Sequence, residues 1–429
     1  MNSQPVEKRP VPMTKQLKVS FHTFGCKLNQ VETESIAGQF AAEGYEICSD
    51  SQADLFIVNT CAVTSRAEAK SRRYIRKLAR LSPGKVIAVG CYPQLKYKEA
   101  AGIDGVKIAA GVKDKFKILS LLNNGDNKVS EDPSLERFPA AEDLNFHSRA
   151  FVKIQDGCDH GCGYCVVPLL RGLSVSLNSS IVIERIKRLL SVQREIVLTG
   201  VDIGSYKDET GCNLADLLNE LVKLPDLVRI RLSSIEPPGF SDELLDICAS
   251  DEKICPHFHL PLQSGSDRIL SMMGRGYSAS DYIELVKKIS AWMPDARIGA
   301  DVIVGFSHEC GEDFNRTKEL IDSLPITHIH VFPFSPRPGT KFSVEEDNVP
   351  FEIKSDRAEE LKKIVHRKRE AYIRRFIGKE MMVFFEGASR DCGFTENYIK
   401  VKVPNFGKSG FFKVRIQNIS GDMVYGVAI

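Results

Sequence analysis

The sequence predicts an α/β protein with three domains. Segments with the patterns of strands and helices alternate twice along the chain, and a C-terminal stretch then contains only short strand-like runs. A chain of 429 residues is also long for one hydrophobic core. We expect an N-terminal parallel α/β sandwich at 16–125, a partial TIM-like (β/α)6 barrel at 146–376 and a small antiparallel OB-like β-barrel at 377–429. Residues 1–15 are predicted to be a disordered tail and residues 126–145 a linker.

Short apolar strands alternate with helices in the first domain. The strands are expected at 18–24, 54–59 and 85–89. Helices are expected at 32–43 and 65–80. Such alternation implies a mostly parallel sheet with helices on its faces.

A second alternating series begins near residue 150. Helices are expected at 181–190, 281–291 and 315–324, among other segments. The candidate strands lie at 150–155, 195–199, 228–233, 257–262, 297–304 and 327–332. Six such units predict an incomplete form of the parallel barrel whose active sites lie at the C-terminal ends of its strands.

A charged helix at 352–376 precedes the β-rich C-terminal segment. Short strands are expected at 382–386, 398–403, 411–416 and 423–427, with glycines in the turns between them. A barrel of this size often binds RNA. Five aromatic residues among its lysines are candidates to stack on unpaired bases, although about half are expected in the core. They are Phe394, Tyr398, Phe406, Phe411 and Phe412.

The composition limits the class of protein. The net charge is only +2, so any nucleic-acid site must be a local patch. No apolar run is long enough for a membrane span, and residues 1–14 lack the apolar core of a signal peptide. Twelve cysteines without a secretion signal favour reduced thiols, bound to metals or buried. We therefore expect a cytoplasmic protein.

Three cysteines lie together directly after the first strand of the second domain, in Cys158-Asp-His-Gly-Cys162-Gly-Tyr164-Cys165. Three thiolates on one loop can bind three irons of a 4Fe–4S cluster and leave the fourth iron open to a chelating molecule. A zinc site is the alternative, but no matched second pair of cysteines lies nearby. Their position above a βα barrel favours the iron–sulfur cluster.

This segment resembles the cysteine motif of the radical S-adenosylmethionine superfamily. The resemblance implies that the open iron binds S-adenosylmethionine, which one electron cleaves to methionine and a 5′-deoxyadenosyl radical. It makes Cys158, Cys162 and Cys165 essential for catalysis and places Tyr164 near the adenine of the cofactor.

Three further cysteines each follow a predicted strand of the first domain. Cys26, Cys61 and Cys91 are distant in sequence but occupy the same place relative to those strands. The C-terminal ends of parallel strands lie along one edge of a sheet, so the three cysteines should converge. Burial as separate thiols is the alternative, but it is less expected for three cysteines at one topological position. We predict a second 4Fe–4S cluster there.

After the tail, nearly the whole chain resembles the methylthiotransferases, which join a three-cysteine domain, a radical S-adenosylmethionine barrel and a C-terminal TRAM barrel. Five segments resemble the branch that acts on tRNA threonylcarbamoyladenosine. They are Thr23-Phe-Gly-Cys-Lys-Leu-Asn-Gln30, Leu198-Thr-Gly-Val-Asp-Ile-Gly204, Ser233-Ser-Ile-Glu-Pro237, His259-Leu-Pro-Leu-Gln-Ser-Gly-Ser266 and Val331-Phe-Pro-Phe-Ser-Pro-Arg-Pro-Gly339.

The resemblance implies a radical reaction at C2 of the modified adenosine at tRNA position 37, where a methylthio group replaces hydrogen. One cluster and S-adenosylmethionine would generate the radical, and the other cluster would carry the sulfur. C2 is an unactivated aromatic carbon, so a radical cofactor must perform the difficult step. The resemblance also implies a monomer that binds the tRNA anticodon stem-loop and takes electrons from a donor such as flavodoxin or ferredoxin.

By the same resemblance, several residues at strand ends are candidate cofactor contacts, and the alternative for each is a structural role in the turn. They are Thr199, Gly200, Gln263, Asp301 and Gly305. One loop departs from the family pattern, because Arg171-Gly172 is followed by Leu173-Ser-Val-Ser176 instead of further arginines. Arg171 alone remains a candidate contact there, for RNA or cofactor.

The predicted helix after Cys61 is strongly basic, with Glu68 as its only acid. Such runs are usually solvated helix faces, but this one begins beside a predicted cluster, which favours phosphate contact. The candidate RNA contacts on it are Arg66, Lys70, Arg73, Arg76 and Lys77.

Other functions remain open at the level of sequence. The substrate could be isopentenyladenosine in tRNA or an aspartate of a ribosomal protein, which other branches of the same family modify. A non-catalytic RNA-binding protein with zinc at both cysteine sites is the alternative from another class.

Overall fold

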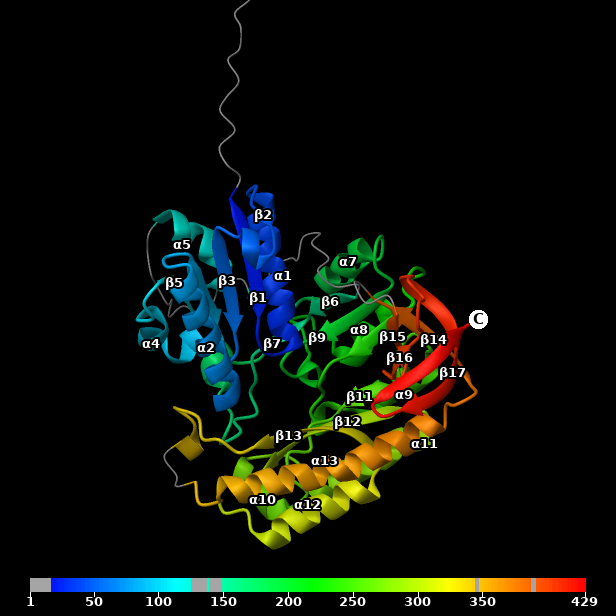
Figure 1. Ribbon diagram of the computed structural model, residues 1–429. Coiled ribbons are helices and arrows are strands. Elements are labelled where there is room, and N and C mark those ends of the chain that lie inside the picture. Colours follow the sequence, from blue (N-terminus) through cyan, green and yellow to red (C-terminus); the bar gives the residue numbers. More distant parts are fainter. Residues whose placement is uncertain (1–16, 125–136, 139–148, 344–346, 387–390) are drawn as a thin grey trace, which may run out of the picture.

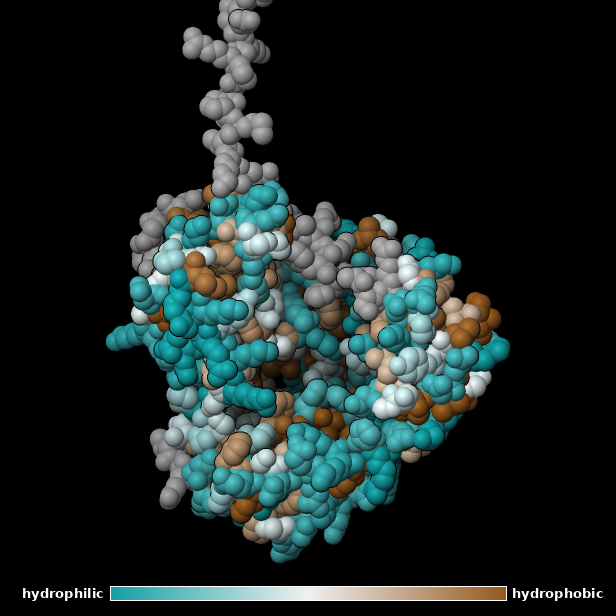
Figure 2. All heavy atoms as spheres, in the orientation of Figure 1, coloured by the Kyte–Doolittle hydropathy of each residue, from teal (hydrophilic) through white to brown (hydrophobic). Residues whose placement is uncertain are grey.

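The computed structural model describes residues 17–124, 137–138, 149–343, 347–386 and 391–429. The predicted tail and nearly all of the predicted linker lie outside these residues. The described part of the chain forms the three predicted units (Figure 1), and the space-filling view shows a hollow near the centre of the molecule (Figure 2). None of its helices is long and apolar enough to cross a membrane.

The first unit is a parallel α/β sandwich, as predicted. Its sheet has the strand order β2-β1-β3-β4-β5, and every neighbouring pair is parallel. The strands are β1 (Lys18–Thr23), β2 (Glu46–Ile47), β3 (Leu55–Thr60), β4 (Val86–Gly90) and β5 (Val106–Ala110). The sequence analysis missed β2 and β5, because β2 has two residues and β5 begins with a partly polar pair.

Helices cover both faces of this sheet. On one face, α1 (Lys27–Ala42) and α5 (Ile118–Asn124) pack around Ile36 and Phe40. On the other, α2 (Ser65–Leu81), α3 (Cys91–Leu95) and α4 (Tyr97–Ala101) pack around Ile75. Thr64 caps α2, because its hydroxyl accepts a hydrogen bond from the Ala67 amide at 3.1 Å.

The second unit is a partial barrel of six parallel strands, as predicted. They are β6 (Ala150–Lys153), β9 (Glu195–Thr199), β10 (Arg229–Leu232), β11 (His257–His259), β12 (Arg297–Val304) and β13 (Ile326–Pro333). The strands form two sheets, β10-β9-β6 and β11-β12-β13, which are joined by the parallel bridges Ile230↔Ile254 and Ser234↔His259. A short antiparallel pair, β7 (Gln155–Asp156) and β8 (Val175–Ser176), follows β6 along the chain.

Seven helices connect these strands within the described residues. They are α6 (Val167–Arg171), α7 (Ser179–Leu189), α8 (Leu214–Leu221), α9 (Asp242–Ser250), α10 (Asp267–Met273), α11 (Ala279–Trp292) and α12 (Gly311–Ser323). The long helix α13 (Phe351–Arg374) runs along β13 and α12 (Figure 1). Its buried residues Ala358, Leu361 and Val365 join the main core of the barrel.

The third unit is a closed five-stranded barrel in the order β14-β15-β16-β18-β17. Its strands are β14 (Glu380–Phe385), β15 (Cys392–Thr395), β16 (Lys400–Lys402), β17 (Gly410–Ser420) and β18 (Met423–Ala428). The barrel is antiparallel, as predicted, except that β16 and β18 pair in parallel. The predicted boundary at residue 376 falls between α13 and β14, and the domain limits themselves stay predictions.

Candidate active site

The loop after β7 carries the three neighbouring cysteines of the barrel. Gly157 has a left-handed backbone with φ of +75°, and a Cβ atom there would collide with the Leu173 carbonyl. The amide of Cys158 donates to the Gly172 carbonyl at 3.1 Å, and Gln155 Nε2 donates to the Gly157 carbonyl at 2.8 Å. Glycine is therefore required where the chain turns from the strand into the cysteine loop.

Cys158, Cys162 and Cys165 line a single cavity of about 270 Å³ at the C-terminal ends of the barrel strands. The first domain contributes Val63 and Thr64 to the same cavity, just after its own Cys61. The cavity therefore lies where the two cysteine-bearing domains meet.

Three of the predicted cofactor contacts also line this cavity, namely Tyr164, Gln263 and Asp301. The Tyr164 ring meets Phe306 edge-on, with centroids 6.2 Å apart. Gln263 adopts an unusual backbone conformation with φ of +62°, and its backbone N–H donates to the backbone carbonyl of Asp301 at 2.8 Å. A non-glycine residue held in this region is characteristic of a functional position.

The other three predicted cofactor contacts do not belong to the wall that the described residues form around the cavity. Thr199 is buried, and a Cβ atom on Gly200 would approach Gln155 Oε1 to 2.8 Å. Gly305 has φ of +66°, and its amide donates to Glu309 Oε2 at 2.5 Å. The assignment of Thr199, Gly200 and Gly305 as cofactor contacts stays a prediction.

Arg275 is a site residue that the sequence analysis missed. Its buried guanidinium donates to Cys162 Sγ at 3.2 Å and forms an ion pair with Glu236. A cation beside a thiolate stabilises the negative charge that the sulfur needs in order to bind metal. No spacing in the sequence indicates this contact, because Arg275 follows α10, more than a hundred residues after the loop.

His160 and Asp202 were also missed. His160 lies inside the cysteine loop, and its Nε2 is 2.8 Å from Asp202 Oδ2. The other oxygen of Asp202 accepts from the amides of Gly204 and Glu236, both at 3.1 Å. Asp202 therefore ties the cysteine loop to the segments that follow β9 and β10.

The three distant cysteines of the first domain do converge. Cys26 precedes α1, Cys61 follows β3 and Cys91 opens α3 directly after β4. A Cβ atom on Gly25 would lie 2.7 Å from the Cβ of Cys61, which places the Cys26 and Cys61 segments in contact. Burial raises the pKa of Cys61, and the proximity of Cys91 and Cys26 raises it further.

Both sets of cysteines fit a metal cluster. Burial raises the pKa of Cys61 and that of Cys165 each to about 12, so without a metal these groups are neutral thiols. Iron is a cation that binds and stabilises the thiolate form, and its binding displaces the proton. Each set offers three sulfur ligands and no disulfide, since all twelve cysteines are free.

Arg171 does not face RNA, and the prediction of an RNA contact there is corrected. Its side chain is buried, and its guanidinium donates to Glu32 at 2.9 Å, to Asp156 at 3.1 Å and to Asn29 at 2.9 Å. Glu32 also pairs with Lys153 at 3.0 Å. These contacts join α1 of the first domain to the barrel, which leaves no free charge on Arg171 for a phosphate.

The Glu32 carboxylate is the centre of this interdomain contact. Burial alone would raise its pKa, but the charges of Arg171, Lys115 and Lys153 hold the pKa of Glu32 well below its ordinary value. The ionised carboxylate therefore compensates three buried cations. The network holds the two cysteine sites in a fixed relation.

The basic face of α2 is solvent-exposed. Its five candidate RNA contacts are Arg66, Lys70, Arg73, Arg76 and Lys77. The only acid of the helix, Glu68, is buried and pairs with Lys96 at 2.8 Å and with Arg337. Figure 2 shows a hydrophilic surface over α2, next to the central hollow. The role of these residues in RNA binding stays a prediction.

The five aromatic residues of the terminal barrel are half-buried, and a role in stacking on RNA stays a prediction for them. The Phe394 and Tyr398 rings stack at 4.8 Å, and Arg149 and Arg231 from the partial barrel approach the Tyr398 ring at 5.6 and 5.0 Å. Phe406 and Phe412 pack against the core of the barrel, and Phe411 lies beside Phe384 and Arg229. Phe406 and Phe412 thus join the core of the small barrel, as expected for about half of the five, and the other three rings contact arginines of the partial barrel.

Two family models match the chain. Residues 18–111 match the Uncharacterized protein family UPF0004, and residues 152–321 match the Radical SAM superfamily. Over 405 residues the chain is 37% identical to the threonylcarbamoyladenosine tRNA methylthiotransferase MtaB of Aquifex aeolicus, covering 92% of this chain and 98% of that protein. The chain belongs to the methylthiotransferase family of radical S-adenosylmethionine enzymes.

Other relatives support this membership. The MtaB protein of Thermotoga maritima is 36% identical over 418 residues, 95% of this chain and 96% of that protein. The tRNA-2-methylthio-N(6)-dimethylallyladenosine synthase of Acetivibrio thermocellus is 33% identical, over 93% of this chain and 87% of that protein. The cofactors of this methylthiotransferase family are S-adenosylmethionine and two 4Fe–4S clusters, which the two sets of cysteines fit.

Solved structures show the same fold. The radical S-adenosylmethionine methyltransferase TsrM of Kitasatospora setae, with cobalamin and a [4Fe-4S] cluster bound, has a TM-score of 0.59 and 14% identity. The similarity covers 77% of this chain and 74% of that chain. At this identity the likeness supports the arrangement of the domains and not a shared substrate.

Proposed function

We propose that this methylthiotransferase converts N6-threonylcarbamoyladenosine at tRNA position 37 into its 2-methylthio derivative. The observation that carries the proposal is the similarity to MtaB relatives over 92% of the chain, combined with two converging sets of cysteines. Membership of the radical S-adenosylmethionine family argues against the zinc-stabilised RNA-binding protein. The isopentenyladenosine and ribosomal-protein substrates are not favoured, because the relatives most consistently carry the threonylcarbamoyl name.

Cys158, Cys162 and Cys165 would hold the cluster that works with S-adenosylmethionine, and Cys26, Cys61 and Cys91 would hold the second cluster. When bound, these groups supply the radical that removes hydrogen from C2 and the sulfur that replaces it. C2 carries no acidic proton, so the side chains around the cavity need not act as acids or bases on the substrate. Their task is to bind, orient and exclude water.

Three cavity residues would position the cofactor. Tyr164 lies in the cysteine loop itself, where its ring can face the adenine. Gln263 and Asp301 supply polar groups at the ends of β11 and β12 for hydroxyl or amino groups. Arg275 would stabilise the thiolate of Cys162, to whose sulfur it donates.

The exposed face of α2 would bind the tRNA backbone. Thr64, which caps this helix, lines the cavity, and the basic residues of the helix extend away from that point. A phosphate backbone following α2 would therefore lead to the nucleoside in the cavity. The partner is the anticodon stem-loop that carries threonylcarbamoyladenosine.

Three further assignments belong to the same proposal. The electron donor is a low-potential protein such as flavodoxin or ferredoxin, the chain acts as a monomer, and the enzyme works in the cytoplasm. Twelve free cysteines are compatible with a reducing compartment.

The test is the nucleoside composition of bulk tRNA. A strain that lacks the gene should accumulate threonylcarbamoyladenosine and lose its 2-methylthio derivative, measured by liquid chromatography and mass spectrometry. A plasmid copy of the gene should restore the derivative. An unchanged profile in the deletion strain would exclude this substrate.

A further inference from the structure

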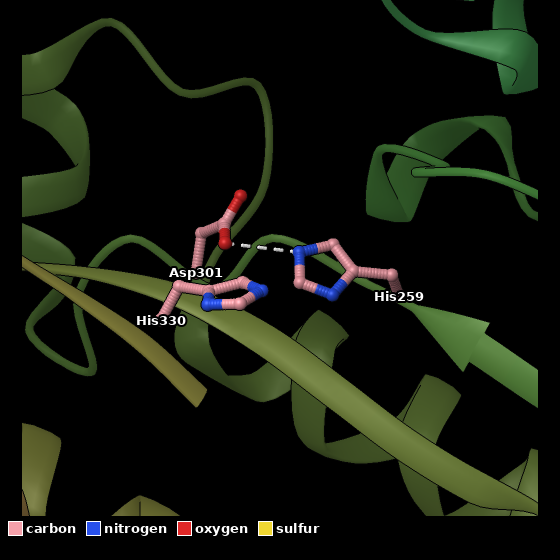
Figure 3. A group of neighbouring side chains, drawn as sticks. All are labelled: His259, Asp301 and His330. Atoms are coloured by element: carbon pink, nitrogen blue, oxygen red, sulfur yellow. Dashed lines mark ion pairs between the residues drawn. The ribbon is translucent and has the colours of Figure 1, made fainter. Parts of the chain in front are cut away.

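Three polar side chains on neighbouring strands meet inside the partial barrel, and the sequence analysis assigned a role only to one of them. They are His259 on β11, Asp301 on β12 and His330 on β13 (Figure 3). Asp301 Oδ1 lies 3.0 Å from His259 Nε2, and the ligand atoms of all three lie within 4.8 Å of one another. Asp301 and His330 are paired in register across the sheet.

A further imidazole extends the group. His328 Nε2 lies 3.3 Å from His330 Nε2, and the two rings are 4.6 Å apart. Gly299 leaves space for these rings, because a Cβ atom there would lie 3.1 Å from His259 Nδ1. The sequence carries a signal for this arrangement. Two strands flank the strand of Asp301, and each has two histidines separated by one residue, which places them on the same face: His257-Phe-His259 and His328-Ile-His330.

This group is continuous with the active cavity. Asp301 lines the cavity together with the cysteines, and Phe332, which lies two residues after His330 on the same face of β13, also lines it. His330 is exposed although it belongs to a barrel strand. The molecule is hollowed between the first domain and the terminal barrel (Figure 2).

The first domain places a cation near the same group. Lys27 is the first residue of α1, directly after Cys26, and its ammonium lies 5.8 Å from the centre of the Tyr398 ring. The Lys27 charge is among the groups that lower the pKa of His330. The Tyr398 ring in turn lies 4.6 Å from the His257 ring of β11, which links Lys27 through ring contacts to the strand that carries His259.

We propose that Lys27, His259, His328 and His330 bind the polar N6 arm of the nucleoside, with Lys27 facing its carboxylate and Asp301 orienting His259. This inference rests on the proposed function and adds the subsite that selects the substrate. The threonylcarbamoyl arm has a carboxylate, a hydroxyl and a urea, so it needs both donors and acceptors.

The electrostatics of the histidines suit this role. Desolvation, with His330 and Arg297 nearby, lowers the pKa of His328 to about 3, and partial desolvation also lowers the pKa of His330. Neutral imidazole offers one donor and one acceptor, which matches hydroxyl and urea groups. The dimethylallyl arm named for the Acetivibrio relative is apolar and would leave these groups unpaired. A site built from hydrogen-bonding groups discriminates strongly against an analogue that offers these groups no partner.

A divalent transition metal is the competing occupant, because two imidazoles and a carboxylate are also metal ligands. Two observations favour the nucleoside arm. The Nε2 atom of His330 is already within hydrogen-bond distance of His328, and the group opens into the cavity that must admit the nucleoside.

The test measures binding of two anticodon stem-loops of identical sequence, one with threonylcarbamoyladenosine and one with unmodified adenosine at position 37. Fluorescence anisotropy with the full-length reconstituted enzyme needs no turnover. The wild type should prefer the modified RNA, and His330→Ala and Lys27→Met should each reduce that preference roughly tenfold. The affinity of each variant for the unmodified RNA should stay within about twofold of the wild-type affinity.

Two controls accompany the test. His366→Ala removes a solvent-exposed histidine of α13 and should keep the wild-type preference. His330→Gln retains a hydrogen-bond donor and an acceptor, so this variant should keep part of the preference for the modified RNA. Cluster absorbance and circular dichroism of each variant show whether it has folded and loaded normally.

The possible outcomes separate the two hypotheses. The subsite is overturned if His330→Ala lowers the affinity for both RNAs equally, or changes neither affinity. The proposed function still stands in that case if the wild type methylthiolates the modified RNA. Zinc, manganese, cobalt or nickel bound at one per chain and lost in His330→Ala also overturns the subsite, in favour of a metal. A wild type that binds both RNAs equally and methylthiolates neither overturns the subsite and the proposed function together.

Discussion

The two cysteine sites of this enzyme are built in opposite ways. Cys158, Cys162 and Cys165 lie within eight residues of one loop, whereas the three cysteines of the first domain come from three separate strand ends. The first site depends on local chain geometry, such as the left-handed Gly157. The second depends on the parallel order of a whole sheet, so a disturbance of the fold should affect it more readily.

The largest expected effect separates the chemical roles of the two sites. Replacing Cys158, Cys162 and Cys165 by alanine should abolish reductive cleavage of S-adenosylmethionine, measured as 5′-deoxyadenosine release. Replacing Cys26, Cys61 and Cys91 should leave this cleavage measurable but stop methylthiolation of the RNA.

Cys248→Ala is the matched control, because this buried cysteine belongs to the barrel core away from both sites. It should leave cleavage and methylthiolation unchanged. Methylthiolated product from the Cys26, Cys61 and Cys91 variant would contradict the two-site model.

The next effect concerns the contact that holds the two sites together. Glu32→Ala leaves the buried cations Arg171, Lys115 and Lys153 without their shared carboxylate and should lower the free energy of unfolding by about 3–5 kcal/mol. Urea unfolding monitored by circular dichroism measures the loss. Glu43→Ala, an exposed position just after the same helix, should change stability little.

The Glu32 contribution should also depend on pH. Its folded-state pKa is depressed, so the stabilisation is fully present above the unfolded pKa of about 4.3 and is lost as the pH falls through the folded pKa. The stability difference between wild type and Glu32→Ala should therefore be constant near neutral pH and narrow only in strong acid. A difference that narrows between pH 8 and pH 6 would contradict this assignment.

A smaller effect is expected on RNA binding. It should come from the first domain, because a basic helix follows Cys61 but no helix of comparable charge follows Cys165. The double variant Arg73→Ala, Arg76→Ala should weaken stem-loop binding and reduce the slope of log K against log salt by about 1 to 2. Arg188→Ala on α7 removes an exposed arginine that pairs with Glu184 and should leave the slope unchanged. An unchanged slope in the double variant would show that α2 is only a solvated face.

The smallest expected effect is on the reduction potential of the cluster that the barrel cysteines would bind. Arg275→Met removes the guanidinium that donates to Cys162 Sγ, so the reduction potential of that cluster should fall by tens of millivolts. A redox titration followed by electron paramagnetic resonance measures it. The signal of the cluster in the first domain should not move, and an equal shift of both clusters would indicate a general change in structure.

Much of the fold follows from periodicity and spacing. The strands β9 (Glu195–Thr199) and β12 (Arg297–Val304) coincide with the expected limits, because each is a continuous buried run between turns. The two-residue strand β2 and the parallel closure of β16 on β18 were missed, because pairing across a sheet leaves no local pattern. Arg171 shows the same limit of sequence analysis. It was a candidate for an RNA contact, and its burial against Glu32 excludes that contact.

The sequence by itself determined which residues can bind iron, because ligand type and the spacing of Cys158, Cys162 and Cys165 are local properties of the chain. It also placed three more cysteines at strand ends. Only the tertiary structure decided that Arg275 contacts Cys162, that Arg171 joins two domains, and that His259, Asp301 and His330 meet beside the cavity. The physical reason is that these contacts depend on packing between distant strands and helices, which side-chain chemistry limits but does not specify.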